Sequence, residues 1–366
     1  MLHDKIEIIR HGVIAQSEHI FGNFNWPSIA RLPDGALAVV CSGERFEHID
    51  PFGKVVICYS KDEGKTWTRP ATVIDTLLDD RDAGITAWKD KIIVTSFNNT
   101  KKFQEYCLEV YNHDDMHKNL FRSYLKYIPE GYEERTLGSM YVISDDGYTF
   151  GDIRYAPVMA PHGMTALNDG RLFYAGTLYY SPEEGPKPIC YTISEDGLSW
   201  SQPVPLPLAK PEQGRGWLDQ KKSYFCEPHA LCLPSGRILI GLREEVPGKP
   251  FNTWVMHSDD GGKTFSEPVL VAAGGAPPHL FRHSSGAVIL SYGYRTPPRG
   301  QRVRISDDDG ETFGSELILR GDAPDWDLGY PATAELTDGS LISVYYQRTD
   351  PARRNNSICY TVWKLK

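Results

Sequence analysis

The chain has 366 residues, with 39 Lys and Arg against 48 Asp and Glu, which gives a formal net charge of −9 at pH 7. An acidic chain without a basic block lacks the positive surface that nucleic-acid binding requires, so we expect no nucleic-acid partner. The uninterrupted apolar runs have the length of β-strands and are too short to cross a bilayer, so we expect no membrane partner either.

The start of the chain and its cysteines bear on the cellular compartment. No basic segment followed by an apolar core is present, which predicts a cytoplasmic protein, or a secreted or periplasmic one if an export signal was removed. The seven cysteines are an odd number and lack metal-ligand spacing. We interpret them as free, buried thiols and expect neither a metal ion nor a cofactor. Nothing in the pattern indicates an oligomeric state.

Two kinds of turn alternate along the chain and predict its strands. The first kind is a short polar turn between apolar segments, at Asp34-Gly35, Lys89-Asp90, Asp169-Gly170, Ser235-Gly236, Ser285-Gly286 and Asp338-Gly339. The second kind is an acidic, glycine-containing turn that runs from Ser60 to Trp67, Ser144 to Phe150, Ser194 to Trp200, Ser258 to Phe265 and Ser306 to Phe313. Each kind predicts a β-hairpin.

The alternation of the two hairpins predicts the architecture. Units of four strands that recur about every 50 to 80 residues are typical of β-propeller blades. We therefore predict an all-β protein, a single domain over residues 1–366 that forms a six-bladed β-propeller of four-stranded antiparallel blades. The sixth unit has no acidic turn, and a spare strand lies at 5–10. We expect that N-terminal strand to complete the last blade and close the ring.

One segment in the second blade departs from the strand pattern. Between about 98 and 138, apolar residues recur at helical spacing, namely Leu120, Phe121, Tyr124, Leu125 and Ile128. We predict a helical insertion there. It is either a packing decoration or dimer contact, or a lid or wall of a substrate cleft.

The acidic turns have a structural interpretation. Their Ser, Asp and Thr side chains can bond to the backbone of the turn, and their aromatic side chains can fill the gap between blades. We expect Trp67, Phe150, Trp200, Phe265 and Phe313 to be largely buried and to stabilise the fold.

Functional side chains are expected at the opposite end of the blades. The innermost strands of a propeller run in one direction, so residues at their starts converge at one end of the central channel. Those residues are Asn25, Arg81, Asp82, His162, Glu227, His229, His279 and Tyr330, and the adjacent second strands bring Arg45, Arg243, Arg295 and Arg299 to the same face. Each alone is typical of a solvated rim, but six blades that aim such residues at one funnel are harder to explain as rim. The resemblance described next implies that this funnel takes a carbohydrate substrate.

Three stretches at this end carry a resemblance to a known family: CSGERFEHID at 41–50, CEP at 226–228 and GYPATAELTDGSLISVY at 329–345. Together with the acidic turns, they resemble the sialidase (neuraminidase) superfamily and its Asp-box (BNR) repeats. The resemblance covers nearly the whole chain. It implies that Asp50 is the acid/base, that Tyr330 is the nucleophile and that Glu227 polarises it. It also implies that Arg243, with Arg295 or Arg299, binds a sugar carboxylate.

The chemistry of these residue types fits together. A phenol loses its proton only near pH ~10, so it is a poor nucleophile unless a base takes the proton. Glu227 can act as that base for Tyr330, and a guanidinium presents two parallel donors to a carboxylate. Sialidases are the tyrosine exception among retaining glycosidases. The resemblance thus implies an exo-acting, retaining glycoside hydrolase for a terminal acidic sugar.

Two features depart from the sialidase pattern. Asn25 stands where the family has the first arginine of its carboxylate-binding triad, and Arg31 lies too far along the strand to replace it. Three histidines, His162, His229 and His279, occupy strand starts where a sialidase does not need them. Two alternatives therefore stay open: a polysaccharide lyase for uronic-acid chains that uses these histidines or a tyrosine, and a non-catalytic carbohydrate-binding propeller.

Overall fold

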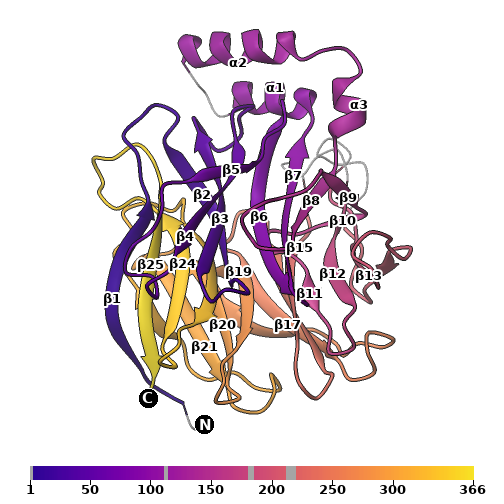
Figure 1. Ribbon diagram of the computed structural model, residues 1–366, viewed down its shortest axis with the longest axis vertical. Helices are drawn as coiled ribbons and strands as arrows, with labels where there is room; N and C mark the ends of the chain where they lie inside the picture. The colour runs from indigo at the N-terminus through magenta and orange to yellow at the C-terminus, as the bar shows by residue number, and fades with distance from the viewer. Residues whose placement is uncertain (1–2, 111–113, 180–184, 212–219) are drawn as a thin grey trace.

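The computed structural model describes residues 3–110, 114–179, 185–211 and 220–366, and its strands form six antiparallel sheets. The sheets are the blades of a propeller, as predicted (Figure 1). From the innermost strand outward, blade 1 has β2 (Asn23–Arg31), β3 (Leu37–Arg45), β4 (Lys54–Ser60) and β5 (Ala71–Ile74). Blade 2 has β6 (Asp79–Trp88), β7 (Lys91–Asn99), β8 (Ser139–Ser144) and β9 (Arg154–Ala156).

The inner strand of blade 3 is divided, because β10 (Val158–Met159) and β11 (Thr165–Ala166) both pair with β12 (Leu172–Leu178), and β13 (Ile189–Ser194) and β14 (Val204–Pro205) follow. Blade 4 has β15 (Tyr224–Cys232), β16 (Ile238–Glu245), β17 (Asn252–Ser258) and β18 (Val269–Ala273). Blade 5 has β19 (Gly275–Arg282), β20 (Val288–Tyr294), β21 (Gly300–Ser306) and β22 (Leu317–Arg320).

The ring closes through the N-terminal strand, as predicted. Blade 6 contains β23 (Gly329–Glu335), β24 (Leu341–Gln347) and β25 (Ser357–Leu365), and β1 (Ile6–Ala15) is its outermost strand. The antiparallel register runs from the pair Ile6 and Leu365 to the pair Ala15 and Ile358. Closure joins the two ends of the chain in one sheet, so neither the first nor the last blade is left incomplete.

The core lies between blades, where six apolar clusters each combine residues of two neighbouring sheets. The aromatic residues of the acidic turns pack against these clusters, but Trp67, Phe150, Trp200, Phe265 and Phe313 are half-buried. They pack against the inter-blade clusters as expected, although part of each side chain remains exposed. Of the seven cysteines, all free, five are buried and two are half-buried.

The acidic turns are held by their own side chains. In the fourth copy, Ser258 Oγ accepts from the amide of Gly262 at 2.9 Å, and Asp260 Oδ1 accepts from the amides of Lys263 and Thr264 at 3.0 and 2.9 Å. The Thr264 hydroxyl donates to Asp260 Oδ2 at 2.6 Å. These aspartates are occupied by the turn itself, which agrees with a structural role.

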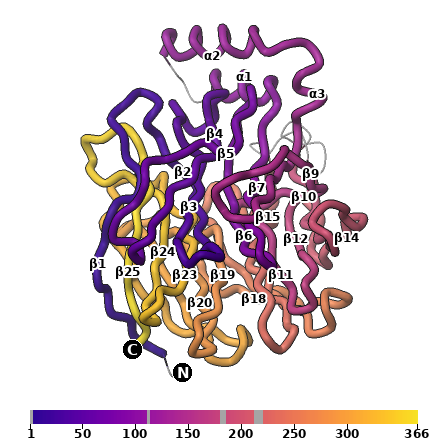
Figure 2. Tube along the Cα trace, viewed as in Figure 1, coloured from indigo at the N-terminus to yellow at the C-terminus, as the bar shows by residue number. Residues whose placement is uncertain are grey.

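The predicted insertion is helical and lies between β7 and β8. It contains α1 (Lys101–Val110), α2 (Asp115–Tyr127) and α3 (Tyr132–Thr136), which lie at one end of the propeller while both termini lie at the other (Figures 1 and 2). The side chains of Phe121, Leu125 and Ile128 are buried, whereas Leu120 is exposed. No helix in the described ranges is long and apolar enough to cross a membrane.

We expect Phe265→Ala to lower the free energy of unfolding by roughly 2 kcal/mol, less than the ~3–5 kcal/mol of a fully buried ring. The ring packs between blades 3 and 4, against Phe173, Ala230 and Ile238. The matched control is Leu198→Ala, which truncates an exposed side chain in the third acidic turn. Denaturant unfolding measures both, and equal stability of the two variants contradicts the inter-blade role of the aromatic residue.

Candidate active site

Four side chains reach the centre of the propeller through the same unusual backbone. Trp26, Asp82, Glu227 and Tyr330 have φ values of 50°, 51°, 45° and 51°. Each lies near the start of an inner strand, where the register with the second strand of its blade shifts. Such β-bulges re-aim a side chain, and a left-handed conformation at a residue with a side chain is strained and concentrates at functional sites. All four residues line one cavity.

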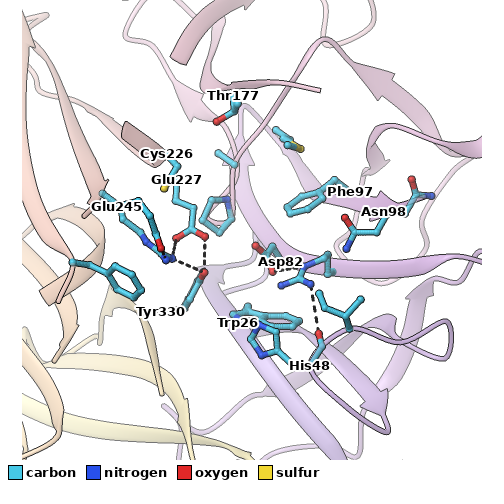
Figure 3. Close-up of a pocket in the computed structure, with 18 of the residues that line it drawn as sticks. Trp26, His48, Asp82, Phe97, Asn98, Thr177, Cys226, Glu227, Glu245 and Tyr330 are labelled. Carbon is cyan, nitrogen blue, oxygen red and sulfur yellow. Dashed lines mark hydrogen bonds and ion pairs between the residues drawn. The ribbon is translucent and has the colours of Figure 1, made fainter. Parts of the chain in front are cut away.

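The cavity has a volume of about 300 Å³. It opens at the end of the propeller where the helices lie, since Phe103 of α1 is part of its wall together with the four bulge residues. Among the alternatives for the insertion, the structure therefore supports a wall of the cleft. Figure 3 shows the lining, with Glu227 and Tyr330 on one side and Asp82 and Trp26 on the other.

Tyr330 and Glu227 are joined by a short hydrogen bond in the cavity. The Tyr330 hydroxyl donates to Glu227 Oε1 at 2.7 Å, and Arg243 Nη1 donates to Glu227 Oε2 at 2.7 Å (Figure 3). Arg243 Nη1 also lies 3.4 Å from the Tyr330 hydroxyl. Burial, and next the charge of Glu227, hold the pKa of Tyr330 well above its usual value. The phenol therefore stays protonated until a base removes its proton during reaction.

Two guanidinium groups converge on one aromatic ring. The guanidinium carbons of Arg243 and Arg295 lie 3.8 and 4.9 Å from the centre of the Phe251 ring. Arg243 Nη2 donates to Glu245 at 2.5 Å, whereas Arg295 donates through Nε and Nη2 to the carbonyl of Leu328, at 3.2 and 3.1 Å. Because that carbonyl is neutral, it leaves the charge of Arg295 available to an anionic ligand.

Asp82 is an acidic group with a perturbed pKa deep in the cavity. Burial raises the pKa of Asp82 to about 6, against the attraction of Arg81 and with the added repulsion of Glu227. Arg81 Nε lies 3.4 Å from Asp82 Oδ1, and the Arg81 guanidinium lies 4.2 Å from the centre of a Trp26 ring. A carboxyl group with a raised pKa can accept a hydrogen bond when it is ionised and donate one when it is protonated.

Asp50 is not at the cavity, which corrects the role that the resemblance implied for it. Its Oδ2 accepts from the amides of Phe46 and Glu47 at 3.0 and 2.8 Å, and its Oδ1 accepts from the amide of Phe52 at 2.8 Å. The side chain is fully buried and does not line the cavity. Burial raises the pKa of Asp50 to about 6. Its carboxyl group bonds to three amides of the loop between β3 and β4.

Three further predicted binding residues lie outside the cavity. Arg45 is fully buried and pairs with Asp79, and Arg299 donates through Nε to the carbonyl of Arg295 at 3.3 Å. Asn25 is fully buried, and its Oδ1 accepts from Asn356 Nδ2 at 2.8 Å. These are corrections: at each position the side chain supports a neighbouring loop or strand, and none lines the cavity.

The three histidines form a buried cluster beneath the cavity instead of lining it. The ring centres of His229 and His279 are 4.3 Å apart and stacked, and His162 lies 5.5 and 5.2 Å from them. The ring of His162 is 6.1 Å from that of Tyr330. Stacked rings do not aim their nitrogens at one point. Within the described ranges, no cluster of three or more His, Cys, Asp or Glu side chains has the arrangement of a metal site.

Sequence reasoning missed several residues of the cavity wall, among them Trp26, His48, Phe251, Trp326 and Asp327. For Trp26 a signal was present. Trp26-Pro27 matches Glu227-Pro228 and Tyr330-Pro331 in position, and proline in a strand is typical of a bulge. The residue before the strand proline is the one that faces the cavity, and in blade 1 that residue is Trp26 and not Asn25. The others come from loops whose path the strand pattern does not predict.

Comparisons with known proteins agree with this fold. A family signature described as "BNR repeat-like domain" matches residues 81–343. No curated protein matches the sequence. A structure of a protein of unknown function from Dyadobacter fermentans superposes with a TM-score of 0.76, at 24% identity and over 99% of each chain.

Two sialidase structures are also similar. The NanB sialidase from Streptococcus pneumoniae has a TM-score of 0.63 at 15% identity, over 100% of this chain and 71% of the other. The intramolecular trans-sialidase from Ruminococcus gnavus has a TM-score of 0.57 at 14% identity, over 95% and 97%. At these identities the likeness shows a shared propeller fold and nothing further.

We expect the histidine cluster to make the protein unstable in acid. Burial lowers the pKa of His229 to about 3 and those of His162 and His279 well below the usual value. Below pH ~6.5 the unfolded chain binds protons that the folded chain does not, so each histidine lowers the free energy of unfolding by up to ~1.4 kcal/mol per pH unit.

The variant His279→Gln should therefore lose less stability than the parent protein between pH 7 and 4, as measured by urea unfolding. The exposed His19 supplies the control variant His19→Gln, which should keep the parent's pH dependence. A parallel decline of all three proteins would show that the buried cluster does not carry the acid sensitivity.

Proposed function

The chain belongs to the BNR repeat-like domain family, and from this premise we propose that it is an exo-acting, retaining glycoside hydrolase with a tyrosine nucleophile. The observation that carries the proposal is the 2.7 Å hydrogen bond from the Tyr330 hydroxyl to Glu227 inside a cavity of about 300 Å³. A cavity of this size suits one terminal sugar.

Tyr330 attacks the anomeric carbon, and its phenolic proton passes to Glu227 as the new bond forms. The raised pKa of Tyr330 makes this transfer necessary, because the phenol does not ionise unaided near neutral pH. Arg243 bonds to the second oxygen of Glu227 and lies beside the phenol, so its charge stabilises the negative charge that develops on the phenolic oxygen as its proton leaves. A covalent glycosyl-tyrosine forms and is hydrolysed in a second step.

We further propose that the sugar is acidic and that its carboxylate binds to Arg295 and Arg243. The two guanidinium groups share the Phe251 ring, which holds them side by side. Arg295 donates its hydrogen bonds to the carbonyl of Leu328, whereas Arg243 already donates to the carboxylates of Glu227 and Glu245. Asp82, with a pKa of about 6, then bonds to a hydroxyl group of the bound sugar.

The alternatives have less support. A lyase that used His162, His229 or His279 as its base has less support, because these side chains do not line the cavity. A non-catalytic binding protein has no need for a strained tyrosine bonded to a half-buried glutamate. Strain of this kind concentrates at reactive sites.

Tyr330→Phe should abolish turnover, with a loss in kcat of at least ~10³-fold. The substrates to screen are aryl glycosides of sialic acid, its deaminated analogue, uronic acids and rhamnose. The control is Tyr345→Phe, which removes a buried hydroxyl of the next strand, outside the cavity. Turnover that survives in Tyr330→Phe contradicts the nucleophile. Binding to a glycan array without turnover of any glycoside would leave only the carbohydrate-binding alternative.

Arg295→Gln should reduce kcat/KM for an acidic glycoside by ~10–100-fold, which corresponds to the free energy of one lost hydrogen bond to a charged group. The kcat/KM for a neutral glycoside should not change. The neighbouring Arg299, whose side chain lies outside the cavity, supplies the control Arg299→Gln. An equal loss for acidic and neutral glycosides would mean that Arg295 supports the loop and does not recognise the carboxylate.

A further inference from the structure

We propose that His48, oriented by Asp327, is the general acid and base of this reaction. The inference rests on the proposed function and fills the role that the buried Asp50 cannot perform. His48 lies in the loop between β3 and β4, two residues before Asp50, and it lines the cavity. The same loop that turns Asp50 inward thus presents an imidazole to the substrate.

The position of His48 suits a group that acts on the leaving oxygen. Its side chain is 38% exposed, whereas that of Asp82 is 4% exposed and faces Glu227 at the floor of the cavity. An exo-acting enzyme holds the terminal sugar at the floor and leaves the departing group at the mouth. Trp326, also at the wall of the cavity, is exposed there as well. The proton donor for the leaving oxygen must lie at that level, where His48 is and Asp82 is not.

Asp327 is a fixed carboxylate beside the imidazole. His48 Nδ1 lies 3.8 Å from Asp327 Oδ1, the Tyr346 hydroxyl donates to the same oxygen at 2.8 Å, and Asn356 Nδ2 donates to Oδ2 at 2.8 Å. Burial opposes ionisation of Asp327, but the donors His48 and Tyr346 outweigh it and hold the pKa of Asp327 well below its usual range. A carboxylate at Nδ1 stabilises the imidazolium and leaves Nε2 for the substrate.

The substitution at Asn25 belongs to this arrangement. Asn356 Nδ2 donates to Asn25 Oδ1 and to Asp327 Oδ2, both at 2.8 Å. One amide group thus joins the departure from the sialidase pattern to the carboxylate beside His48.

The loop of His48 is held from three directions. Phe46 packs against Phe121 of α2, and Ile49 packs against Phe103 of α1. The carbonyl of His48 accepts from Arg45 Nη2 at 3.1 Å and lies 3.5 Å from Arg81 Nη1, and the ring meets Trp26 edge to face at 4.9 Å. The charged groups that contact His48 are Asp327 at its ring, and Arg45 and Arg81 at its carbonyl. Such support gives the precision that a proton-transfer group needs.

In the first step, the imidazolium Nε2 gives its proton to the glycosidic oxygen while the bond from that oxygen to the anomeric carbon breaks and the oxygen keeps the electron pair. The Tyr330 oxygen bonds to the anomeric carbon, and its proton goes to Glu227. In the second step, neutral His48 takes a proton from water as the water oxygen attacks the anomeric carbon. The Tyr330 oxygen leaves with its electron pair and regains the proton from Glu227.

The test is the dependence of rate on the leaving group, measured with a series of aryl glycosides of the turned-over sugar whose phenols differ in pKa. His48→Gln should lose ~10²–10⁴-fold in kcat/KM for the poorest leaving group and far less for the best one, which needs no protonation. With the best leaving group, the glycosyl-Tyr330 form should accumulate, visible by intact mass, and azide should restore turnover as a glycosyl azide. Asp327→Asn, which removes the positioning charge, should show the same pattern more weakly.

The control is His19→Gln, which should behave as the parent across the series. A loss in His48→Gln that is equal for all leaving groups, without azide rescue, overturns the inference, as does the leaving-group pattern in Asp82→Asn instead. If His48→Gln fails to fold by circular dichroism, His48→Asn takes its place. Turnover that depends on Tyr330 but not on His48 refutes this inference alone. A parent protein that turns over no glycoside refutes the proposed function and this inference with it.

Discussion

A left-handed backbone at the start of the inner strands is the constraint on which the cavity depends. A strand alternates its side chains between two faces, and only a bulge turns one of them toward the propeller axis. Trp26, Asp82, Glu227 and Tyr330 all have φ values between 45° and 51°. Residues from four different blades therefore meet in one cavity. The apolar clusters between the blades hold the sheets firmly enough to keep this strained backbone in place.

The two ends of the propeller carry different features: the stabilising acidic turns lie at one end and the cavity at the other. At one end, Ser and Asp side chains of the acidic turns bond to their own backbone, and half-buried aromatic rings join neighbouring blades. At the other end, the bulges place carboxyl, phenol and guanidinium groups in one cavity, and the helical insertion adds Phe103 to its wall. Because the acidic turns bear no reacting group, their presence is evidence of the fold and not of an activity.

The sequence pointed to Tyr330 and Glu227, the pair on which the proposed reaction depends, but it misplaced Asp50, the expected acid/base. The resemblance points to Tyr330 and Glu227, and in the structure the Tyr330 hydroxyl lies 2.7 Å from Glu227 Oε1. Asp50 was expected in the same site, but three backbone amides hold its carboxyl group inside its loop. The path of a loop depends on what packs against it, here Phe121 and Phe103 of the insertion, and a motif read in isolation contains no such information.

By itself, the sequence determined the number of blades, their four strands, the closing N-terminal strand and the helical insertion, because each follows from a local period or a turn. It also placed polar residues at one end of the ring. Only the tertiary structure decided which of them face the cavity. At the start of blade 1 that residue is Trp26 and not its neighbour Asn25, since a bulge of one residue reverses the face of every side chain it touches.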